Sequence, residues 1–201
     1  RKKAAEKMAL AKTEKEKIEL YVQEALAFNK KHNLFIRANK DEVFEKDILD
    51  CVPLVEKIEK ESKILDLGSG GGFPGVVLAI LRPDCEVHLL EKSQKKCYFL
   101  NKTKDTLKLN NIKVLKQTIS KNNTLEEYPT ITARAFSSTQ NILNLTERNL
   151  KKNGKYLLLK GRIEKIEEEM AAINTNNYKY EIIELDNKKY ERHIVQIKKN
   201  E

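Results

Sequence analysis

The stretch that decides the fold of this 201-residue chain is "ILDLGSGGGFPGVVLAI", which runs from Ile64 to Ile80. A short apolar run leads into five glycines between Gly68 and Gly75, although the whole chain has only seven. Apolar residues resume directly after the glycines. Glycine permits positive φ and close approach of a ligand to the backbone, and the free N–H groups at a helix start attract an anion. The stretch therefore predicts a strand, a ligand-binding turn and a helix.

Two kinds of ligand fit this turn. Three glycines match the dinucleotide fingerprint G-x-G-x-x-G after a strand, namely Gly70, Gly72 and Gly75. An acidic residue two positions before a G-x-G-x-G, here Asp66 before Gly68, is typical instead of enzymes that bind S-adenosylmethionine (SAM). Glu91 ends the next expected strand and suits the ribose hydroxyls of either ligand. The glycines alone leave a pyrophosphate and the methionine carboxylate of SAM both open.

Strand and helix patterns alternate on both sides of the turn. Five short apolar runs are expected to be strands, at 63–67, 86–91, 112–116, 129–134 and 155–160. Helical patterns lie at 74–81, 93–109 and 138–151, and near 162–172, and "NG" at 153–154 is expected to end the third of them. Such alternation is typical of a parallel sheet covered on both faces.

The alternation stops near the end of the chain. Two strands, 178–185 and 190–199, follow each other across a link so short that they must be antiparallel. We therefore expect an α/β fold of Rossmann-like type, with a mostly parallel sheet that ends in an antiparallel hairpin. A dehydrogenase usually needs a further substrate domain, so this ending favours SAM over a nicotinamide cofactor.

The first 62 residues have a different pattern. Apolar residues recur at helical spacing from residue 4 to about 30, and 41–60 is expected to form two short helices divided at Pro53. We expect 1–62 to be an N-terminal helical cap and 63–201 to be the SAM-binding core, together a single structural unit.

Composition narrows the class of protein. The net charge is +9, with 39 Lys and Arg against 30 Asp and Glu, which suits a polyanionic partner or a solvated lysine-rich surface. The chain has no run of about 18 apolar residues, so we expect no membrane span. The first residues also lack a signal-peptide core. The three cysteines and three histidines show no metal-site spacing, so we expect reduced thiols, a cytoplasmic location and no metal.

Segments along nearly the whole chain match one family in order and spacing. They are "FNKKHNL" (28–34), "EKDILDC" (45–51), "DLGSGGGFPG" (66–75), "RPD" (82–84), "LLEKSQKKCYFL" (89–100), "ARAFSS" (133–138), "LLLKG" (157–161) and "ERHIVQIKK" (191–199). Together they resemble the RsmG (GidB) family of bacterial rRNA methyltransferases. The resemblance implies a SAM-dependent enzyme that methylates N7 of one guanine in small-subunit (16S) ribosomal RNA.

The resemblance also implies roles for individual residues. The residues implied for the cofactor are Gly68, Gly70, Phe73, Glu91, Ile119, Ser120 and Arg134. Those implied to face the active cleft or the RNA are Asn33, Lys95, Lys160 and Arg192. The partner is then 16S rRNA or the small ribosomal subunit, with no membrane and no obligate protein partner, so we expect a monomer.

The chain departs from the family pattern in three places. Asp47 stands where the family has His, Phe28 where it has Trp, and "KQTIS" (116–120) replaces a segment with a basic and an acidic residue. The departures leave open a SAM-dependent enzyme with another substrate and a SAM-binding protein without turnover. A nicotinamide-dependent oxidoreductase is disfavoured.

The chemistry implied by the family needs no general base. Guanine N7 has an exposed lone pair and carries no proton. The protein must hold N7 in line with the methyl carbon and the sulfonium sulfur, about 3–3.5 Å from that carbon. Our hypothesis is that Arg134 and Lys160 are catalytic through positioning the base near O6, and that Lys95 contacts an RNA phosphate.

Overall fold

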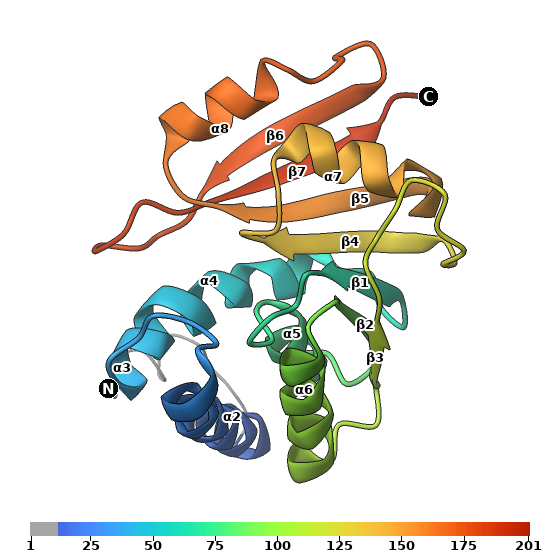
Figure 1. Ribbon diagram of the computed structural model, residues 1–201. Coiled ribbons are helices and arrows are strands. Elements are labelled where there is room, and N and C mark those ends of the chain that lie inside the picture. The colour runs from blue at the N-terminus through green and yellow to red at the C-terminus, as the bar shows by residue number, and fades with distance from the viewer. Residues whose placement is uncertain (1–11) are drawn as a thin grey trace.

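The computed structural model describes residues 12–201, in which a seven-stranded sheet carries helices on both faces (Figure 1). The strand order is β3-β2-β1-β4-β5-β7-β6. The strands are β1 (Lys63–Leu67), β2 (Glu86–Glu91), β3 (Ile112–Lys116), β4 (Tyr128–Arg134), β5 (Leu150–Lys160), β6 (Tyr178–Glu184) and β7 (His193–Lys199). Strands β1 to β5 pair in parallel, and β7 pairs antiparallel with both β5 and β6. The predicted fold class is confirmed.

The sheet separates two hydrophobic cores. One face is covered by α5 (Gly75–Leu81), α6 (Gln94–Leu107) and the N-terminal helices, and the other by α7 (Thr139–Thr146) and α8 (Ile163–Met170) (Figure 1). Successive strand residues point to opposite faces, so Ile64 joins the first core and Leu65 the second. Both faces being covered explains why β1, β2 and β4 are buried along almost their whole length.

Two N-terminal segments pack on the first core. Helix α2 (Lys12–His32) places Phe28 on Phe99 of α6, with ring centroids 5.1 Å apart. A helical run follows, made of α3 (Lys40–Val43), a π-helical turn (Phe44–Ile48), α4 (Leu49–Cys51) and a 3₁₀ helix (Val52–Lys57). The expected change of helix at Pro53 is confirmed, because α4 ends at Cys51 and a separate 3₁₀ helix begins at Val52, with proline in its first turn, where it needs no N–H partner. Val52 itself stays helical, with φ of −58° and ψ of −44°, although a proline follows it. The part of the first predicted helix before residue 12 lies outside the described residues.

The expected helix over 138–151 is too long. Helix α7 ends at Thr146, a 3₁₀ turn covers Glu147–Asn149, and β5 already begins at Leu150. Leu150 pairs with Tyr128 of β4 and is buried, and the register between the two strands then shifts. Asn153, with φ of 63°, lies in this irregular part of β5. The "NG" pair therefore belongs to an irregularity in a strand and does not end a helix.

The strand order reverses between β1 and β4. The chain moves outward from β1 to β2 and β3, and then returns to pair β4 with β1. In open α/β sheets, ligands bind outside the carboxyl ends of the strands at this switch point. The glycine turn leaves β1 at this place.

Candidate active site formed by two adjoining cavities

Two cavities open at the carboxyl edge of the sheet and share a wall. The smaller has a volume of about 410 Å³ and is lined by the glycine turn, the end of β2 and the loop after β3. The larger, about 660 Å³, lies between the N-terminal helical run, the end of β5 and the start of α8. Ala135, Phe136 and Ser137, directly after β4, line both. A ligand in one cavity therefore adjoins a ligand in the other.

The smaller cavity depends on positions where only glycine fits. Gly68 has a φ of +61°, and a Cβ atom there would collide with the ring of Phe136. A Cβ atom on Gly75 would lie 2.5 Å from Oδ2 of Asp66. Close packing at these two positions holds the turn against β1 and leaves space above it.

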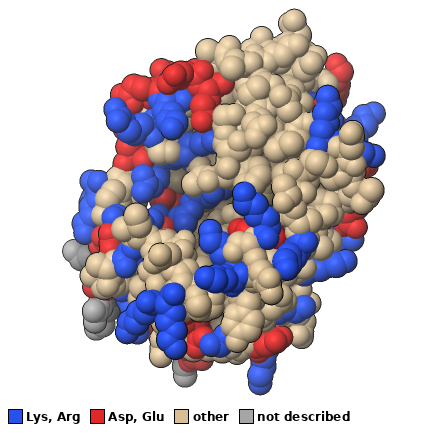
Figure 2. Space-filling view, in the orientation of Figure 1, with Lys and Arg blue, Asp and Glu red and all other residues tan. Residues whose placement is uncertain are grey.

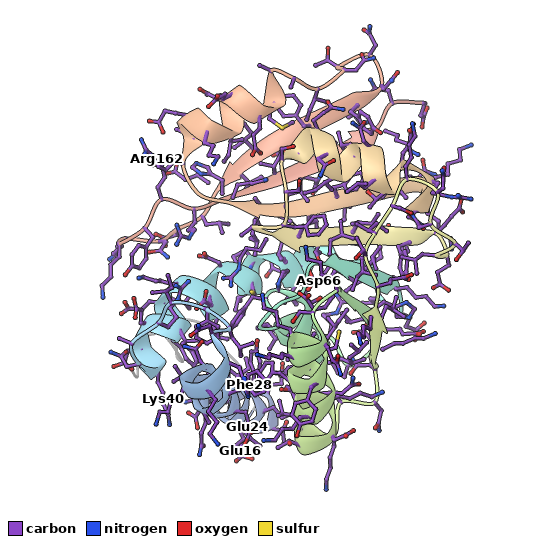
Figure 3. All side chains as sticks on the ribbon, in the orientation of Figure 1. Glu16, Glu24, Phe28, Lys40, Asp66 and Arg162 are labelled. Atoms are coloured by element: carbon purple, nitrogen blue, oxygen red, sulfur yellow. The ribbon has the colours of Figure 1, made fainter. Side chains whose placement is uncertain are left out.

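Asp66 is fully buried beneath the turn, near the middle of the sheet in Figure 3. Its Oδ1 accepts a hydrogen bond from Thr132 (2.9 Å) and its Oδ2 accepts one from the Gly75 N–H (3.1 Å). Burial raises the pKa of Asp66 to about 6, against the lowering effect of its hydrogen bonds. Asp66 therefore supports the turn from below and does not line either cavity.

Glu91 ties the turn to the start of α6. Its two carboxylate oxygens accept hydrogen bonds from the backbone N–H groups of Gly70 (3.0 Å) and Ser93 (2.7 Å). It lines the smaller cavity at the end of β2. A carboxylate has about four lone-pair sites, so Glu91 can still accept hydrogen bonds from ribose hydroxyls.

The other expected cofactor residues fall in different places. Gly68, Glu91 and Ile119 line the smaller cavity. Ser120 is exposed beside it. Phe73 is buried under the turn, with its ring 5.4 Å from Tyr21 and 6.1 Å from Phe35, so it supports the turn from the side of the N-terminal helices.

The larger cavity is strongly basic. Its cationic side chains are Arg37, Lys46, Arg134, Lys160, Arg162, Lys165 and Arg192. Two carboxylates, Asp50 and Glu169, stand among them. Figure 2 shows Lys and Arg gathered around the hollow in the middle of this face. An excess of positive charge in a concave site attracts a polyanion.

Arg134 is held by a buried carboxylate from the N-terminal helices. Asp47 is 0 % exposed and accepts hydrogen bonds from Arg134 Nη1 (2.5 Å) and from Arg37 Nε and Nη2 (both 2.8 Å). The Arg134 guanidinium also stacks 4.8 Å from the centre of the Phe73 ring. Burial lowers the pKa of Arg134, but the charge and hydrogen bond of Asp47 together with nearby Cys51 and Tyr21 raise it by more, so the group stays cationic. Asp47 thus fixes two cavity cations.

Lys160 and Arg192 are also paired. Lys160 donates a hydrogen bond to the carbonyl oxygen of Ser137 (3.3 Å) and lies 3.1 Å from Oε2 of Glu169. Arg192 precedes β7, and its Nε donates to Oδ2 of Asp50 (2.9 Å). Burial raises the pKa of Asp50 despite this pair.

The structure does not bring all the expected RNA-binding residues into the cavities. Arg192 lines the larger one. Asn33 is exposed in the loop after α2, and Lys95 is exposed in the first turn of α6. On this helix it is Lys96 that lines the smaller cavity. Lys95 and Lys96 are neighbours in the first turn of the same helix, so the sequence alone could not show which of them faces the cavity.

The sequence analysis did not identify the shared wall of Ala135, Phe136 and Ser137 as part of the active site. Ala135 has a φ of 51°, which is rare for a residue with a side chain and typical of functional sites. Its conformation turns the chain away from β4 so that Phe136 covers Gly68. The segment "ARAFSS" after the fourth strand was the available signal, but only Arg134 was singled out.

The residues present fit SAM. The turn gives close backbone approach at Gly68, Glu91 suits a ribose, and Ile119 and Leu145 give the smaller cavity an apolar part for an adenine ring. Among residues 12–201, no group of three or more His, Cys, Asp or Glu is placed to hold a metal ion. The three cysteines are free and buried.

Comparison with known sequences decides the family. The model of the GidB family, described as rRNA small subunit methyltransferase G, matches residues 14–195. The chain belongs to this family. Ribosomal RNA small subunit methyltransferase G of Brachyspira hyodysenteriae is 39 % identical over 183 residues, covering 90 % of this chain and 89 % of the relative. The protein of the same name from Aliarcobacter butzleri is 36 % identical and covers 82 % of each chain. The resemblance to the RsmG (GidB) family is confirmed.

Solved structures support the fold. Precorrin-6y C5,15-methyltransferase from Geobacter metallireducens superposes with a TM-score of 0.61 at 13 % identity, covering 84 % of this chain and 92 % of that one. tRNA (m1A58) methyltransferase TrmI from Aquifex aeolicus gives 0.63 at 16 % identity, covering 76 % and 68 %. These likenesses show that the chain shares the fold of these methyltransferases, and its membership of the GidB family makes SAM its cofactor. Within the described residues, no helix has the length and apolar character needed to cross a membrane.

Proposed function

We propose that this chain transfers a methyl group from SAM to N7 of a guanine in 16S ribosomal RNA. The observation that carries the proposal is the shared wall of Ala135, Phe136 and Ser137 between a glycine-built cavity and a basic cavity. A small cofactor and a nucleotide can meet across such a wall. The family name and the relatives' names specify the small ribosomal subunit RNA as the substrate class.

The cofactor residues proposed are those at the smaller cavity. Gly68, Gly70 and Glu91 would hold the methionine and ribose parts, and Ile119 with Ser120 would flank the adenine. Phe73 would act from beneath the turn, and Arg134, which lines the larger cavity, would act through its contact with the Phe73 ring. Bound SAM supplies an electrophilic methyl group on a sulfonium centre.

The chain's own task is to hold the guanine. Because N7 carries no proton, no side chain has to remove one before attack. Lys160 and Arg134 lie in the larger cavity, and each is held in place by an ion pair with a carboxylate. The N–H groups not used in these pairs therefore have defined positions from which they can donate to a base. We assign them to orient the base, with hydrogen bonds to O6 that limit its rotation.

The surface around the larger cavity is proposed to bind the RNA backbone. Arg192 lies at the cavity, and Asn33 and Lys95 extend the contact to the loop after α2 and the start of α6. A target base must leave its stack to reach the cavity. We further propose that the protein acts as a monomer in the cytoplasm, on 16S rRNA or on the small subunit, with 1–62 as a cap on a 63–201 core.

The decisive experiment measures transfer of a radiolabelled methyl group from SAM to naked 16S rRNA and to small subunits, with the modified nucleotide identified after digestion. We expect 7-methylguanosine with at least one of these substrates. Label on another nucleotide or on a small molecule would favour a different methyltransferase. Binding of SAM without transfer would favour a binding protein.

Ligand-induced melting separates the cofactor assignment from the substrate assignment. SAM at 100-fold excess over its Kd should stabilise the fold by about 2.7 kcal/mol, and NAD should not. Arg134→Ala and Lys160→Ala should each slow methylation. Rates within about twofold of the wild type for both variants would overturn their assignment to the base.

A further inference from the structure

One wall of the larger cavity carries a carboxylate among cations. Helix α8 and the residue before it present Arg162, Lys165, Ile166 and Glu169 to the cavity, and these positions share one face of a helix. Figure 3 shows Arg162 where the chain enters α8. A carboxylate repels the phosphates of an RNA backbone, so we expect it to contact another part of the nucleotide.

Glu169 is held in one orientation. Its Oε2 accepts a hydrogen bond from Thr139 Oγ1 at 2.9 Å and lies 3.1 Å from Lys160 Nζ. The side chain is 18 % exposed. Both of these side-chain contacts use Oε2, and the carboxylate also accepts a hydrogen bond from the backbone N–H of Thr139. A carboxylate has about four lone-pair sites, so one remains to accept from a ligand in the cavity.

Glu169 is ionised at neutral pH. Burial raises its pKa, but the hydrogen bonds from Lys160 and Thr139 lower it by more, so the net pKa lies below the usual range for glutamate. An ionised carboxylate only accepts hydrogen bonds. Glu169 therefore selects a ligand edge that carries N–H donors.

Lys160 stands beside Glu169, next to the shared wall. Its ammonium group donates to the carbonyl oxygen of Ser137, which lines both cavities. An ammonium has three N–H donors, and two directions are used by Ser137 and Glu169. Lys160 thus places a donor against Ser137 of the shared wall, and Glu169 places an acceptor against Thr139, which follows that wall and lines neither cavity.

The edge of guanine has the complementary order. Next to N7 comes O6, an acceptor, and then the N1–H and N2–H donors. With N7 toward the smaller cavity, O6 faces a donor and the N1–H and N2–H groups face an acceptor. Adenine presents a donor amino group next to N7 and an unprotonated N1 beyond it, which mismatches both partners.

We propose that Glu169 is the specificity-determining residue for guanine: it accepts a hydrogen bond from N2–H while Lys160 donates to O6. The inference rests on the proposed function, because it assumes that the base enters the larger cavity with N7 toward the cofactor. The other carboxylate, Asp50, is 4 % exposed in its side chain and is bound by Arg192, which leaves it less able to meet a base.

The test compares Glu169→Gln with Glu168→Gln, a control at the exposed neighbour on the same helix. Each is assayed on RNA with guanine or inosine at the target position, since inosine keeps O6 and N1–H but lacks the N2 amino group. Methylation rates are measured, and equilibrium affinities are measured by fluorescence anisotropy with S-adenosylhomocysteine present.

The wild type and Glu168→Gln should prefer guanine over inosine by about tenfold or more, the size expected for a hydrogen bond to a charged group. Glu169→Gln should lose at least tenfold on guanine and treat the two bases within about twofold, in rate and in affinity. A Glu169→Gln protein that keeps the wild-type guanine-to-inosine ratio would overturn the inference, even if it were slower on both. Absence of methylation by the wild type on guanine would instead refute the proposed function.

A second variant covers the case in which Glu169→Gln does not fold. Glu169→Asp keeps the charge beside Lys160 but withdraws the carboxylate from the cavity by one methylene. We expect its guanine-to-inosine ratio to fall toward one. A folded Glu169→Asp with an unchanged ratio would overturn the inference as well.

Discussion

The two cavities of the site are built by different means. The smaller forms around the backbone of the glycine turn, whose contacts include Gly75 N–H to Asp66, nine residues apart, and Gly70 N–H to Glu91, 21 residues apart. The larger is lined by charged side chains, and two of its cations are fixed by carboxylates of the N-terminal helical run: Arg134 by Asp47 across 87 residues and Arg192 by Asp50 across 142. A cofactor common to many enzymes is met by a local motif, while the substrate is met by ion pairs that exist only once the N-terminal helices have docked. The expected outcomes below test this contrast.

The largest effect is expected at the buried carboxylate of the larger cavity. Asp47→Ala leaves Arg37 and Arg134 facing each other without their anion, and loss of one partner of a buried pair costs about 3 kcal/mol or more. Urea unfolding should show this loss. The control is Glu45→Ala, which removes the exposed pair with Lys189 and should cost less than about 1 kcal/mol. Equal losses in the two variants would mean that Asp47 has no special structural role.

The next effect concerns the carboxyl beneath the smaller cavity. The pKa of Asp66 is about 6 in the folded chain and about 3.8 when unfolded, so the folded state binds the proton more tightly. Its contribution to stability is fully present below pH 3.8 and is lost as the pH rises through 6, by up to about 3 kcal/mol. Asp66→Asn removes this titration. The difference in unfolding free energy between wild type and Asp66→Asn should therefore shift against the wild type between pH 4 and 7, and a constant difference would contradict the raised pKa.

A smaller effect is expected from the glycine turn. Gly68→Ala introduces a Cβ at positive φ, against the Phe136 ring, and the strain of about 1–2 kcal/mol falls on the wall that both cavities share. Isothermal titration should show SAM binding weakened about tenfold. Gly161→Ala is the matched control, because its Cβ would meet no atom closer than 3.9 Å, and it should bind SAM as the wild type does. If both variants bind normally, the turn does not depend on close backbone approach.

The smallest effect concerns the rim. Lys95→Ala should reduce the slope of log affinity for RNA against log salt by about one, the amount expected for a single phosphate contact. Lys102→Ala, on the same helix farther from the cavities, should leave the slope unchanged. Identical slopes in the two variants would mean that Lys95 does not contact an RNA phosphate.

Much of the fold follows from the sequence. The strand-to-helix alternation and the closing pair of strands each depend on local apolar pattern and short links, and these gave the sheet and its antiparallel end. The errors lie where tertiary contacts override local signals. Leu150 is drawn into β5 by burial against β4, so the helix before it ends early, and Val52 stays helical although Pro53 follows it.

The site divides in the same way. The sequence by itself determined the glycine turn, Asp66 and Glu91, because a turn that brings backbone close to a ligand needs glycines at fixed local spacing. Only the tertiary structure decided that Asp47 fixes Arg134, that Ala135 adopts a left-handed conformation, and that Glu169 stands beside Lys160. The Asp47–Arg134 pair joins segments 87 residues apart, and the Lys160–Glu169 pair joins the end of a strand to a helix that folds back over it. No local spacing encodes which carboxylate will meet which cation once the helices pack on the sheet.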